Sequence, residues 1–348
     1  MTRQTWTALV AAMAFVAVAA GLALIPVPFV TWSPGTAIDV LAAPNGKQVV
    51  SVTGTNTYPT GGQLDLTTVG VTTASAPLTL PEALWAYWLP DRDTLPRDSV
   101  YAPGKSADQV ESEDAQMMQS SQSEAVVAAL RAAKQPVTEL PQIAAVTING
   151  PSQGKLMPGD FILAVDGAKV ADATQISPLV MRHKIGEAVA FSVRRDGNES
   201  TVVVITGQST NDPSKPAVGI TVQTGYSYTP KVSFGIDPNI GGPSAGLIFA
   251  LAIYDRLTPG QLVARQHVAG TGEIAVDGKV GPIGGAQEKI SGAKKGGATV
   301  FLIPEGNCAD VVGLHTSVRL VKVDTLSSAI TALNDLNDPA RAASVPGC

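Results

Sequence analysis

Charged residues are scarce in this chain of 348 residues, and they are not concentrated in any one place. Asp, Glu, Lys and Arg together make up 15% of the sequence, and the formal net charge is −5. Nucleic-acid binding depends on a basic surface that neutralises phosphates, so we expect no nucleic-acid partner. With 45% hydrophobic residues, the chain is also too apolar to be disordered and has room for two or three domains.

Motifs for nucleotides, metals and histidine-dependent hydrolysis are missing as well. A phosphate-binding loop would need a glycine at Ser99, five positions before Gly104 of the only Gly-Lys-Ser segment. The sequence contains three histidines, and no motif pairs one of them with a serine nucleophile. We therefore expect no cofactor, no metal and no ATPase module.

The two cysteines, Cys308 and Cys348, lie in no spacing that is typical of metal ligands and beside no suitable base. Two interpretations stay open for them. An exported pair is compatible with a disulfide that fastens the C-terminal tail, residues 339–348. Two free thiols would fit the sequence nearly as well.

The first 32 residues contain a long apolar run. No charged side chain occurs between Trp6 and Trp32, and about 20 apolar residues suffice to cross a bilayer. The two tryptophans at the ends of the run are typical of membrane interfaces, and Arg3 precedes the run. We expect a cytoplasmic tip and a transmembrane anchor over residues 1–32, with the rest outside the cytoplasm. A signal peptide cleaved near residues 17–19 is the alternative, and it would export the same residues.

Residues 33–124 contain no motif that indicates chemistry. Residues 48–52 and 63–69 have the pattern of strands, with a turn between them. Helices are expected over residues 80–89 and 106–133. We expect this region to pair with the domain at the C-terminal end of the chain or to pack beneath the middle of the chain.

The segment Gly241-Gly242-Pro243-Ser244-Ala245-Gly246 is the most informative stretch. Its glycines and proline predict a tight turn, and the apolar residues that follow, up to residue 257, predict a buried helix. Ser244 would then lie at the start of a helix, where unpaired N–H groups and the helix dipole favour negative charge. Such a serine can act as a nucleophile beside an oxyanion, or it can simply cap the helix.

A second block of motifs begins at Thr271. A hairpin is expected over residues 271–280, then a glycine-rich turn, and then a short helix that carries Lys289. A lysine can accept a proton from a serine near neutral pH only if burial lowers its pKa. Lys289 has apolar and small neighbours in the sequence, which favours burial. The alternative is a surface lysine beside Glu288.

Together, the GPSAG serine, the TGEI segment, the PIGG segment and the Glu-Lys pair at 288–289 resemble the proteolytic domain of the Lon proteases. The resemblance covers about residues 230–335, and we assign the domain to residues 225–338. Many Lon domains carry an aspartate where this chain has Gly241. The Lon fold also often assembles into rings, so the resemblance allows a homo-oligomer such as a hexamer.

This resemblance implies a role for each residue of the two motifs. Ser244 would be the nucleophile and Lys289 the general base of a Ser–Lys dyad. Thr271 would position the lysine by a hydrogen bond. The remaining residues expected to support the site are Gly242, Pro243 and Ala245.

The middle of the chain resembles a PDZ domain of the type found in exported bacterial proteases. The resemblance depends on the segment GKLMPGDFILAVDGAKV, residues 154–170, and we assign the domain to residues 125–208. Residues 173–183 would form its groove helix. PDZ domains bind an extended peptide by adding it as a strand to a sheet edge. The peptide-binding residues are unknown from the sequence, with residues 141–146 as the candidate loop. The alternative is a spacer that binds no peptide.

We therefore predict an α+β protein that consists of a transmembrane helix, a PDZ domain of the β-sandwich or barrel type and a Lon-type α/β domain. The predicted function is that of an ATP-independent, membrane-anchored serine endopeptidase. Its substrates would be exported or membrane-associated proteins, and the PDZ domain would recognise substrates or adaptors. The alternative is a PDZ-based scaffold or chaperone-like protein whose Lon-like domain is inactive.

Overall fold

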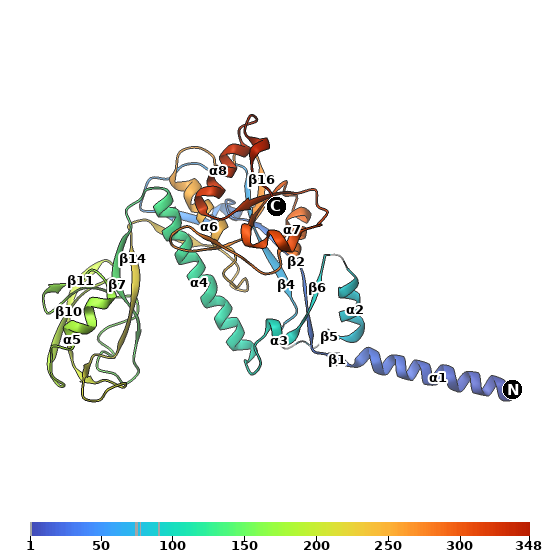
Figure 1. Cartoon of the computed structure of the whole chain (residues 1–348), viewed down its shortest axis with the longest axis horizontal. Coiled ribbons are helices and arrows are strands. Elements are labelled where there is room, and N and C mark those ends of the chain that lie inside the picture. Colours follow the sequence, from blue (N-terminus) through green and yellow to red (C-terminus); the bar gives the residue numbers. More distant parts are fainter. Residues whose placement is uncertain (1, 74–75, 77, 90) are drawn as a thin grey trace. The chain divides into compact units, whose positions relative to one another are not determined.

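The computed structural model describes residues 2–73, 76, 78–89 and 91–348, and these residues form two compact units (Figure 1). The first unit contains Met1–Gln135 and Pro230–Cys348, and the second contains Pro136–Thr229. The second unit is thus inserted into the first. The mixture of helices and sheets agrees with the predicted α+β class. The sequence-based boundaries at residues 124 and 208 differ from these unit limits.

Helix α1 (Arg3–Leu24) is apolar, and none of its residues is buried. By length and composition alone it could cross a membrane, a test that a signal sequence also passes. The helix is shorter than the predicted anchor, because Pro26 and Pro28 follow it and proline disfavours a helix at the preceding residue. Trp32, expected at a membrane interface, lies instead in strand β2 (Phe29–Asp39), where it packs against Gly284.

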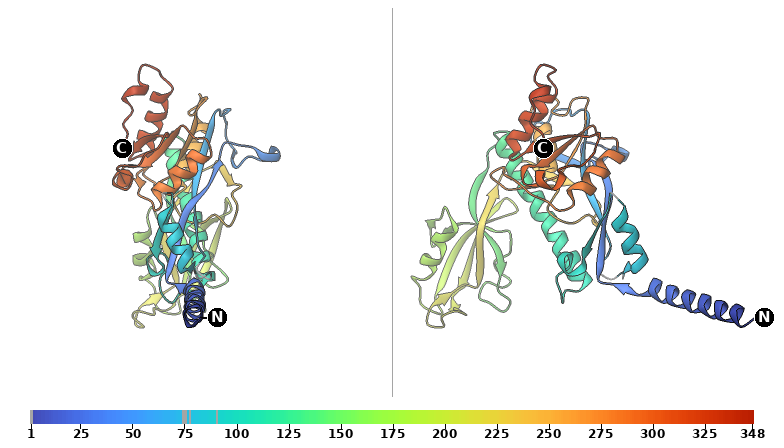
Figure 2. Two further views of the ribbon diagram at one scale, coloured as in Figure 1. Left: turned by 90° about the vertical axis from the view of Figure 1, so that its right-hand side faces the viewer. Right: turned by 45° about the vertical axis from the view of Figure 1, so that its right-hand side comes forward.

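A six-stranded sheet forms the centre of the first unit. Figure 2 shows the same unit from two further sides. Three of its strands precede the inserted unit in the sequence and three follow it. The three strands that follow the insertion run parallel to one another and to β4. Strand β2 runs antiparallel to both β4 and β6. The order is β20 (Arg319–Val323), β19 (Val300–Pro304), β16 (His267–Gly270), β4 (Gln63–Val71), β2 and β6 (Asp93–Pro96).

The two strands expected near residues 48–52 and 63–69 do not form a hairpin. Strand β3 (Val50–Thr53) pairs with β15 (Lys231–Phe234), whereas β4 lies in the central sheet. The pattern of a strand does not specify its partner, and here β3 pairs with β15 and β4 pairs with β16 from beyond the insertion as well as with β2 before it. Two short antiparallel pairs complete the strands of this unit, β1 (Pro26–Val27) with β5 (Leu78–Thr79) and β17 (Glu273–Ile274) with β18 (Val280–Gly281).

Helix α6 (Gly246–Leu257) is the most deeply buried helix described in the first unit, as its apolar sequence predicts. Helix α4 (Ala107–Ala132) packs against it, and α4 begins at a capping box between Ser106 and Gln109. Helix α7 (Ala286–Lys295) packs on β2 and β4. The other helices of this unit are α2 (Leu80–Trp88), α3 (Arg97–Val100) and α8 (Leu326–Leu336).

The second unit contains a sheet in the order β11-β10-β8-β7-β14, and the strand expected at residues 161–165 is β8. A hairpin turns at residues 196–197, where Asp196 and Gly197 both adopt the positive φ angles that a tight turn requires. The elements are β7 (Thr138–Val146), β8 (Phe161–Val165), β9 (Ala168–Lys169), α5 (Ile176–Val180), β10 (Ala188–Arg195), β11 (Asn198–Ile205), β12 (Gly207–Gln208), β13 (Pro216–Ala217) and β14 (Ile220–Ser227).

Cys308 and Cys348 form a disulfide, which decides between the two interpretations that the sequence left open. The tail is also held by the side chain of Arg319, which donates hydrogen bonds to the main-chain oxygens of Ala342 and Val345. Val345 itself is buried. The last residues of the chain are therefore fastened to the edge of the central sheet.

Candidate active site

The loop before α6 is held in place by α4. The N–H group of Gly242 donates a hydrogen bond of 3.0 Å to the main-chain oxygen of Asp114, and Gly242 has a φ of 86°, which favours glycine. The Ser121 hydroxyl donates to the main-chain oxygen of Pro243 at 2.7 Å. The helix begins at Gly246, where a Cβ atom would lie only 2.8 Å from the Ser121 oxygen. The turn that the sequence predicts is therefore fixed by contacts with α4.

Ser244 does not cap helix α6. The N-cap residue is Ala245, and no side chain accepts a hydrogen bond there. The main-chain oxygen of Ser244 instead accepts hydrogen bonds from the N–H of Gly272 and from the hydroxyl of Thr271, at 2.8 Å and 3.0 Å. The Ser244 hydroxyl is thus left available for another partner.

That partner is Lys289, which α7 places opposite the loop. Its Nζ lies 2.8 Å from the Oγ of Ser244 and 3.1 Å from the Oγ1 of Thr271. Because the Thr271 hydroxyl donates its hydrogen to the main-chain oxygen of Ser244, its oxygen is free to accept a hydrogen from Lys289. The three side chains that the sequence selected from two separate motifs therefore meet in the structure.

Burial controls the charge of Lys289. The residue is 4% exposed, and removal of its ammonium group from water lowers its pKa from 10.5 to about 8. The negative charges of Glu273 and, to a smaller extent, Glu288 oppose this change. At pH 7 Lys289 would be neutral in about one molecule in ten, and in these molecules its amine can accept a proton.

The carboxyl of Glu288, the residue before Lys289, is also buried. Burial raises its pKa to about 7, and the neighbouring Asp93 on β6 contributes in the same direction. A protonated Glu288 exerts no attraction on the Lys289 ammonium, so this environment also helps the lysine to lose its proton. The buried interaction between Glu288 and Asp93 could not be predicted from the sequence, where Glu288 is only part of the Glu-Lys motif and a neighbour of Lys289.

Two main-chain donors lie next to the Ser244 hydroxyl. Among the described residues, the N–H groups of Ser244 and Ala245 have no hydrogen-bond acceptor. They stand at the N-terminus of the 12-residue helix α6, where the helix dipole favours negative charge. This geometry suits an oxyanion that forms at Ser244.

A cleft of about 450 Å³ opens over these groups. Thr68 and Val69 of β4 form one wall, and Met118 of α4 lies on another. Trp32 also lines the cleft, and its ring lies so close to Gly284 that a Cβ there would be 2.7 Å from it. The full set of site residues that the sequence predicted, Gly242, Pro243, Ser244, Ala245, Thr271 and Lys289, lies in the cleft or just beneath it.

Several residues of this site were missed by the sequence analysis. Ser121 and Met118 come from the helix that showed no chemical motif, and Trp32 had been assigned to the membrane anchor. The one available signal was the unusual polar run around Ser121 within an otherwise regular helix. In the part of the chain that the structure describes, no group of three His, Cys, Asp or Glu side chains could hold a metal ion.

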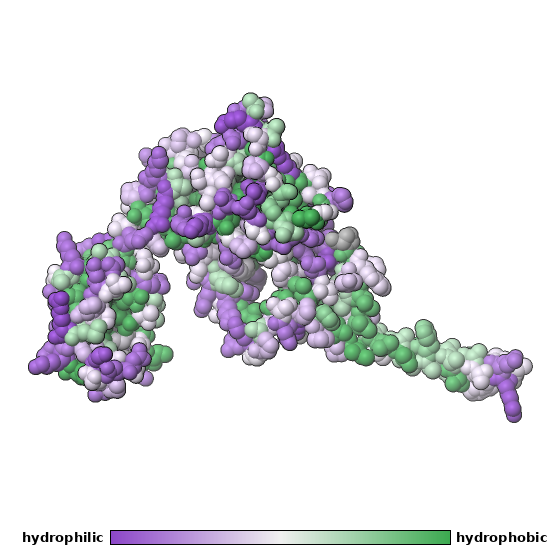
Figure 3. Space-filling view, in the orientation of Figure 1, coloured by the Kyte–Doolittle hydropathy of each residue, from purple (hydrophilic) through white to green (hydrophobic). Residues whose placement is uncertain are grey.

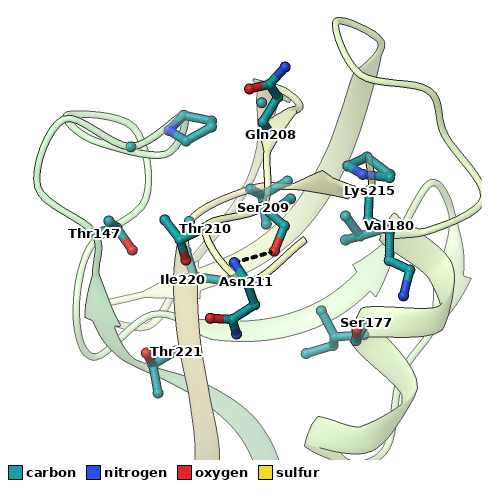
Figure 4. Close-up of a pocket in the computed structure, with 18 of the residues that line it drawn as sticks. Thr147, Ser177, Val180, Gln208, Ser209, Thr210, Asn211, Lys215, Ile220 and Thr221 are labelled. Atoms are coloured by element: carbon teal, nitrogen blue, oxygen red, sulfur yellow. Dashed lines mark hydrogen bonds between the residues drawn. The ribbon is translucent and has the colours of Figure 1, made fainter. Parts of the chain in front are cut away.

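The second unit contains a groove of its own, with a volume of about 1040 Å³. Ser177 and Val180 of α5 line one side of it, and Ile220 and Thr221 of β14 line the other (Figure 4). Strand β14 lies at the end of the sheet, where its outer edge has no neighbouring strand among the described residues. The expected loop at residues 141–146 is wrong, because these residues form part of strand β7 in the middle of the sheet.

Comparison with known proteins supports both the Lon-type assignment and the PDZ assignment. The family described as the Lon protease (S16) C-terminal proteolytic domain matches residues 232–333, and the PDZ domain family matches residues 116–206. The Lon protease of Orientia tsutsugamushi is 35% identical over 109 residues, and Lon protease 1 of Bacillus subtilis is 45% identical over 78 residues. These matches cover 29% and 22% of this chain but only 14% and 10% of the relatives.

A solved structure, the PDZ domain of an SdrC-like protein from Listeria monocytogenes, is also similar to part of the chain. It is 18% identical, covers 24% of this chain and 85% of that one, and gives a TM-score of 0.22. The two family matches coincide with the two regions in which the sequence motifs occur. The chain therefore contains a PDZ domain and a serine-peptidase domain of the Lon type.

Proposed function

We propose that the protein is an ATP-independent, membrane-anchored serine endopeptidase in which Ser244 and Lys289 form the catalytic dyad. The observation that carries this proposal is the 2.8 Å contact between the Ser244 hydroxyl and a buried lysine whose pKa is lowered to about 8. A buried lysine is costly for a fold, and its placement against a serine in a cleft is the arrangement that nucleophilic catalysis requires.

The reaction would begin when neutral Lys289 accepts the hydroxyl proton of Ser244. The serine Oγ then attacks the carbonyl carbon of the peptide bond, and the N–H groups of Ser244 and Ala245 would hold the negative oxygen. As the carbon–nitrogen bond breaks, Lys289 returns the proton to the leaving amine. Lys289 next takes a proton from water as the water oxygen attacks the acyl carbon. It then returns that proton to the Ser244 Oγ as the bond between Oγ and the acyl carbon breaks, which restores the serine hydroxyl and the neutral lysine.

Thr271 would orient the lysine for this proton transfer. A neutral amine has two N–H groups and one lone pair. One N–H group is directed to the Thr271 oxygen, which can accept because its own hydrogen is bound to the Ser244 main chain. The lone pair can then face the Ser244 hydroxyl. Thr271 is thus a positioning residue for Lys289.

Two observations support a location outside the cytoplasm. Helix α1 could cross a membrane with Arg3 on the cytoplasmic side, and the Cys308–Cys348 disulfide is typical of an oxidising compartment. Substrates would then be exported or membrane-associated proteins. A homo-oligomer such as a hexamer belongs to the same proposal, and the mass of the detergent-solubilised protein would test it.

The groove beside β14 would bind an extended peptide, from a substrate or an adaptor. A free strand edge supplies main-chain hydrogen bonds, and the apolar side chains of α5 supply pockets for the peptide side chains. We place the carboxylate-binding loop at residues 217–219, where Gly219 has a φ of 71° at the mouth of the groove. Recognition by the PDZ domain would bring a polypeptide to the protease.

The test is cleavage of an unfolded protein, such as reduced casein, by the full chain in detergent without ATP. We expect Ser244→Ala and Lys289→Ala each to abolish cleavage. Lys279→Ala is the matched control, because Lys279 is an exposed lysine on a turn near the same motif and should not affect the rate. Wild-type rates in either dyad variant would exclude the dyad.

The rival function, a scaffold with an inactive Lon-like domain, predicts no cleavage by any of these proteins. It would also predict no covalent product with a serine-directed reagent. Mass spectrometry after treatment with a fluorophosphonate distinguishes the two, because only an activated serine reacts. Labelling of the wild type at Ser244, and of the Lys279→Ala variant but not of Lys289→Ala, is the expected pattern.

A further inference from the structure

Helix α2 has an inverted pattern of burial. Its small residues Ala83 and Ala86 face the interior of the unit, with Ala86 only 2% exposed. Its large aromatic residues face outward, with Trp85 66% exposed and Trp88 73% exposed. A water-soluble helix would normally bury its largest apolar side chains, so these tryptophans require another environment.

Four of the outward residues form a stripe, whereas Tyr87, which is 70% exposed, lies off it. Pro81, Leu84, Trp85 and Trp88 follow the spacing that places residues on one face of a helix. This stripe lines one side of a shallow apolar groove of about 360 Å³. The other side of the groove belongs to the last turns of α1, with Leu22 at its centre, so the stripe and the end of α1 share one surface.

Main-chain hydrogen bonds fix α2 to the end of α1. Strand β1 pairs with β5, so that Val27 lies opposite Leu78, directly before α2. The N–H of Leu80, the first residue of α2, donates to the main-chain oxygen of Ile25, the residue that ends α1. The two helices come together at a steep angle in Figures 1 and 2, and the apolar surface of α1 continues onto this part of the unit in Figure 3.

The position of the stripe beside the end of α1 indicates what covers it. The last turn of a helix that crosses a bilayer lies at the level of the lipid headgroups, and α2 is bonded to that turn. Tryptophan is enriched at this level because its ring is apolar and its N–H is polar. We propose that the stripe of α2 is a second membrane contact, which lies in the interface of the bilayer that α1 crosses. This inference rests on the proposed membrane anchor.

The contact would also orient the protease. The segment that follows α2 binds to α7, because Asp91 forms an ion pair of 2.7 Å with Lys295. Asp93 in β6 lies beside Glu288, the neighbour of Lys289. The helix that carries the proposed base is therefore connected to the membrane-facing segment on two sides. The cleft would be held at a defined height above the bilayer, which suits substrates that emerge from the membrane.

The test uses tryptophan fluorescence of the full chain reconstituted in phosphatidylcholine vesicles, with bromine atoms placed either near the headgroup or deep in the acyl chains. The chain has four tryptophans, so phenylalanine substitutions can leave chosen ones. One variant keeps Trp85 and Trp88, and a second keeps only Trp6 at the start of α1. A third replaces all four and carries Val312→Trp, because Val312 is 83% exposed on the same unit.

We expect strong quenching of Trp85 and Trp88 by the shallow bromines, weaker quenching by the deep ones, and no quenching of the Val312→Trp variant. Quenching of Trp6 without quenching of Trp85 and Trp88 would overturn the inference but keep the membrane anchor. Absence of quenching at Trp6 as well would overturn both. Protection of Trp85 and Trp88 from acrylamide without quenching by bromine would show that a protein covers the stripe, and it would also overturn the inference.

Discussion

Ser121 donates its hydroxyl hydrogen to the main-chain oxygen of Pro243 at 2.7 Å, across 122 positions of sequence. The contact ties α4 to the residue that precedes Ser244. Together with the hydrogen bond from the Gly242 N–H to the main-chain oxygen of Asp114, it holds the loop that carries Ser244 against α4. A helix from the part of the chain that showed no chemical motif thus controls where the Ser244 hydroxyl lies.

The first prediction is that Ser121→Ala lowers kcat about tenfold, because a lost hydrogen bond of about 1 to 1.5 kcal/mol would loosen the loop. The midpoint of the pH profile should not move, since Lys289 is unaffected. Ser123→Ala is the control, because the Ser123 hydroxyl is exposed and binds only its own helix, at Gln119. A wild-type kcat for Ser121→Ala would show that the loop needs no support from α4.

The second prediction concerns pH. Because Lys289 must be neutral to accept a proton, kcat/KM should rise with pH to a plateau, with a midpoint near the Lys289 pKa of about 8. Glu273→Gln should lower this midpoint, because the Glu273 charge raises the pKa of Lys289. Glu305→Gln, at a surface ion pair with Lys322, serves as the control. A midpoint that rises in Glu273→Gln would contradict the assignment of Lys289 as the base.

The third prediction is that Lys289→Met stabilises the fold while it abolishes cleavage. The folded protein binds fewer protons than the unfolded chain between pH 8 and 10.5, so the stability of the wild type should rise with pH across this window. Below pH 8 the folded protein carries the full free-energy penalty of burying the charged Lys289. This penalty is up to about 3 kcal/mol, because each unit of pKa shift corresponds to roughly 1.4 kcal/mol. Urea unfolding at pH 7 should show the gain, and Lys279→Met should show none.

The fourth prediction concerns the disulfide. Removing it by the double substitution Cys308→Ser and Cys348→Ser should lower the free energy of unfolding by about 3 to 4 kcal/mol, because the bond closes a loop of 40 residues. Thermal unfolding with and without reductant measures this change. The wild type in reductant should behave like the double variant, and reductant should leave the double variant unchanged.

The fifth prediction tests the groove of the second unit. Met181→Glu would replace an apolar side chain that lines the groove beside α5 with a charged one, so selection of C-terminal peptides with an apolar last residue from a displayed library should fail. Val203→Glu is the matched control, because Val203 is similarly exposed on β11 and does not line the groove. If both variants select the same peptides equally well, the peptide binds outside this groove.

The site was largely predictable from the sequence because its chemical groups come from two short motifs. Ser244, Thr271 and Lys289 each lie in a local pattern whose turn and helix are specified nearby. Ser121 and Trp32 could not be found in this way, because their roles depend on contacts with residues far along the chain. The partner of β3 could not be identified for the same reason, since the strand pattern of residues 50–53 gives no sign that it pairs with β15.

The edge strand of the PDZ sheet could not be predicted from the sequence motif either. Strand β14 follows the segment that carries the PDZ motif and pairs with β7, which precedes it. The sequence pattern placed the end of the domain at residue 208, before this strand. The candidate loop at residues 141–146 is instead part of a strand that β8 and β14 cover on both edges.

The placement of β4 between β2 and β16 has a consequence for biosynthesis. During synthesis, β2 and β4 leave the ribosome long before β16, and the inserted second unit is complete before the first unit can close. Domains generally fold as they emerge, so the PDZ unit would fold first. The Ser244 and Lys289 side chains can meet only after residue 289 has been delivered to the same compartment. The order of the chain would thus keep the peptidase inactive until synthesis of the chain is nearly finished.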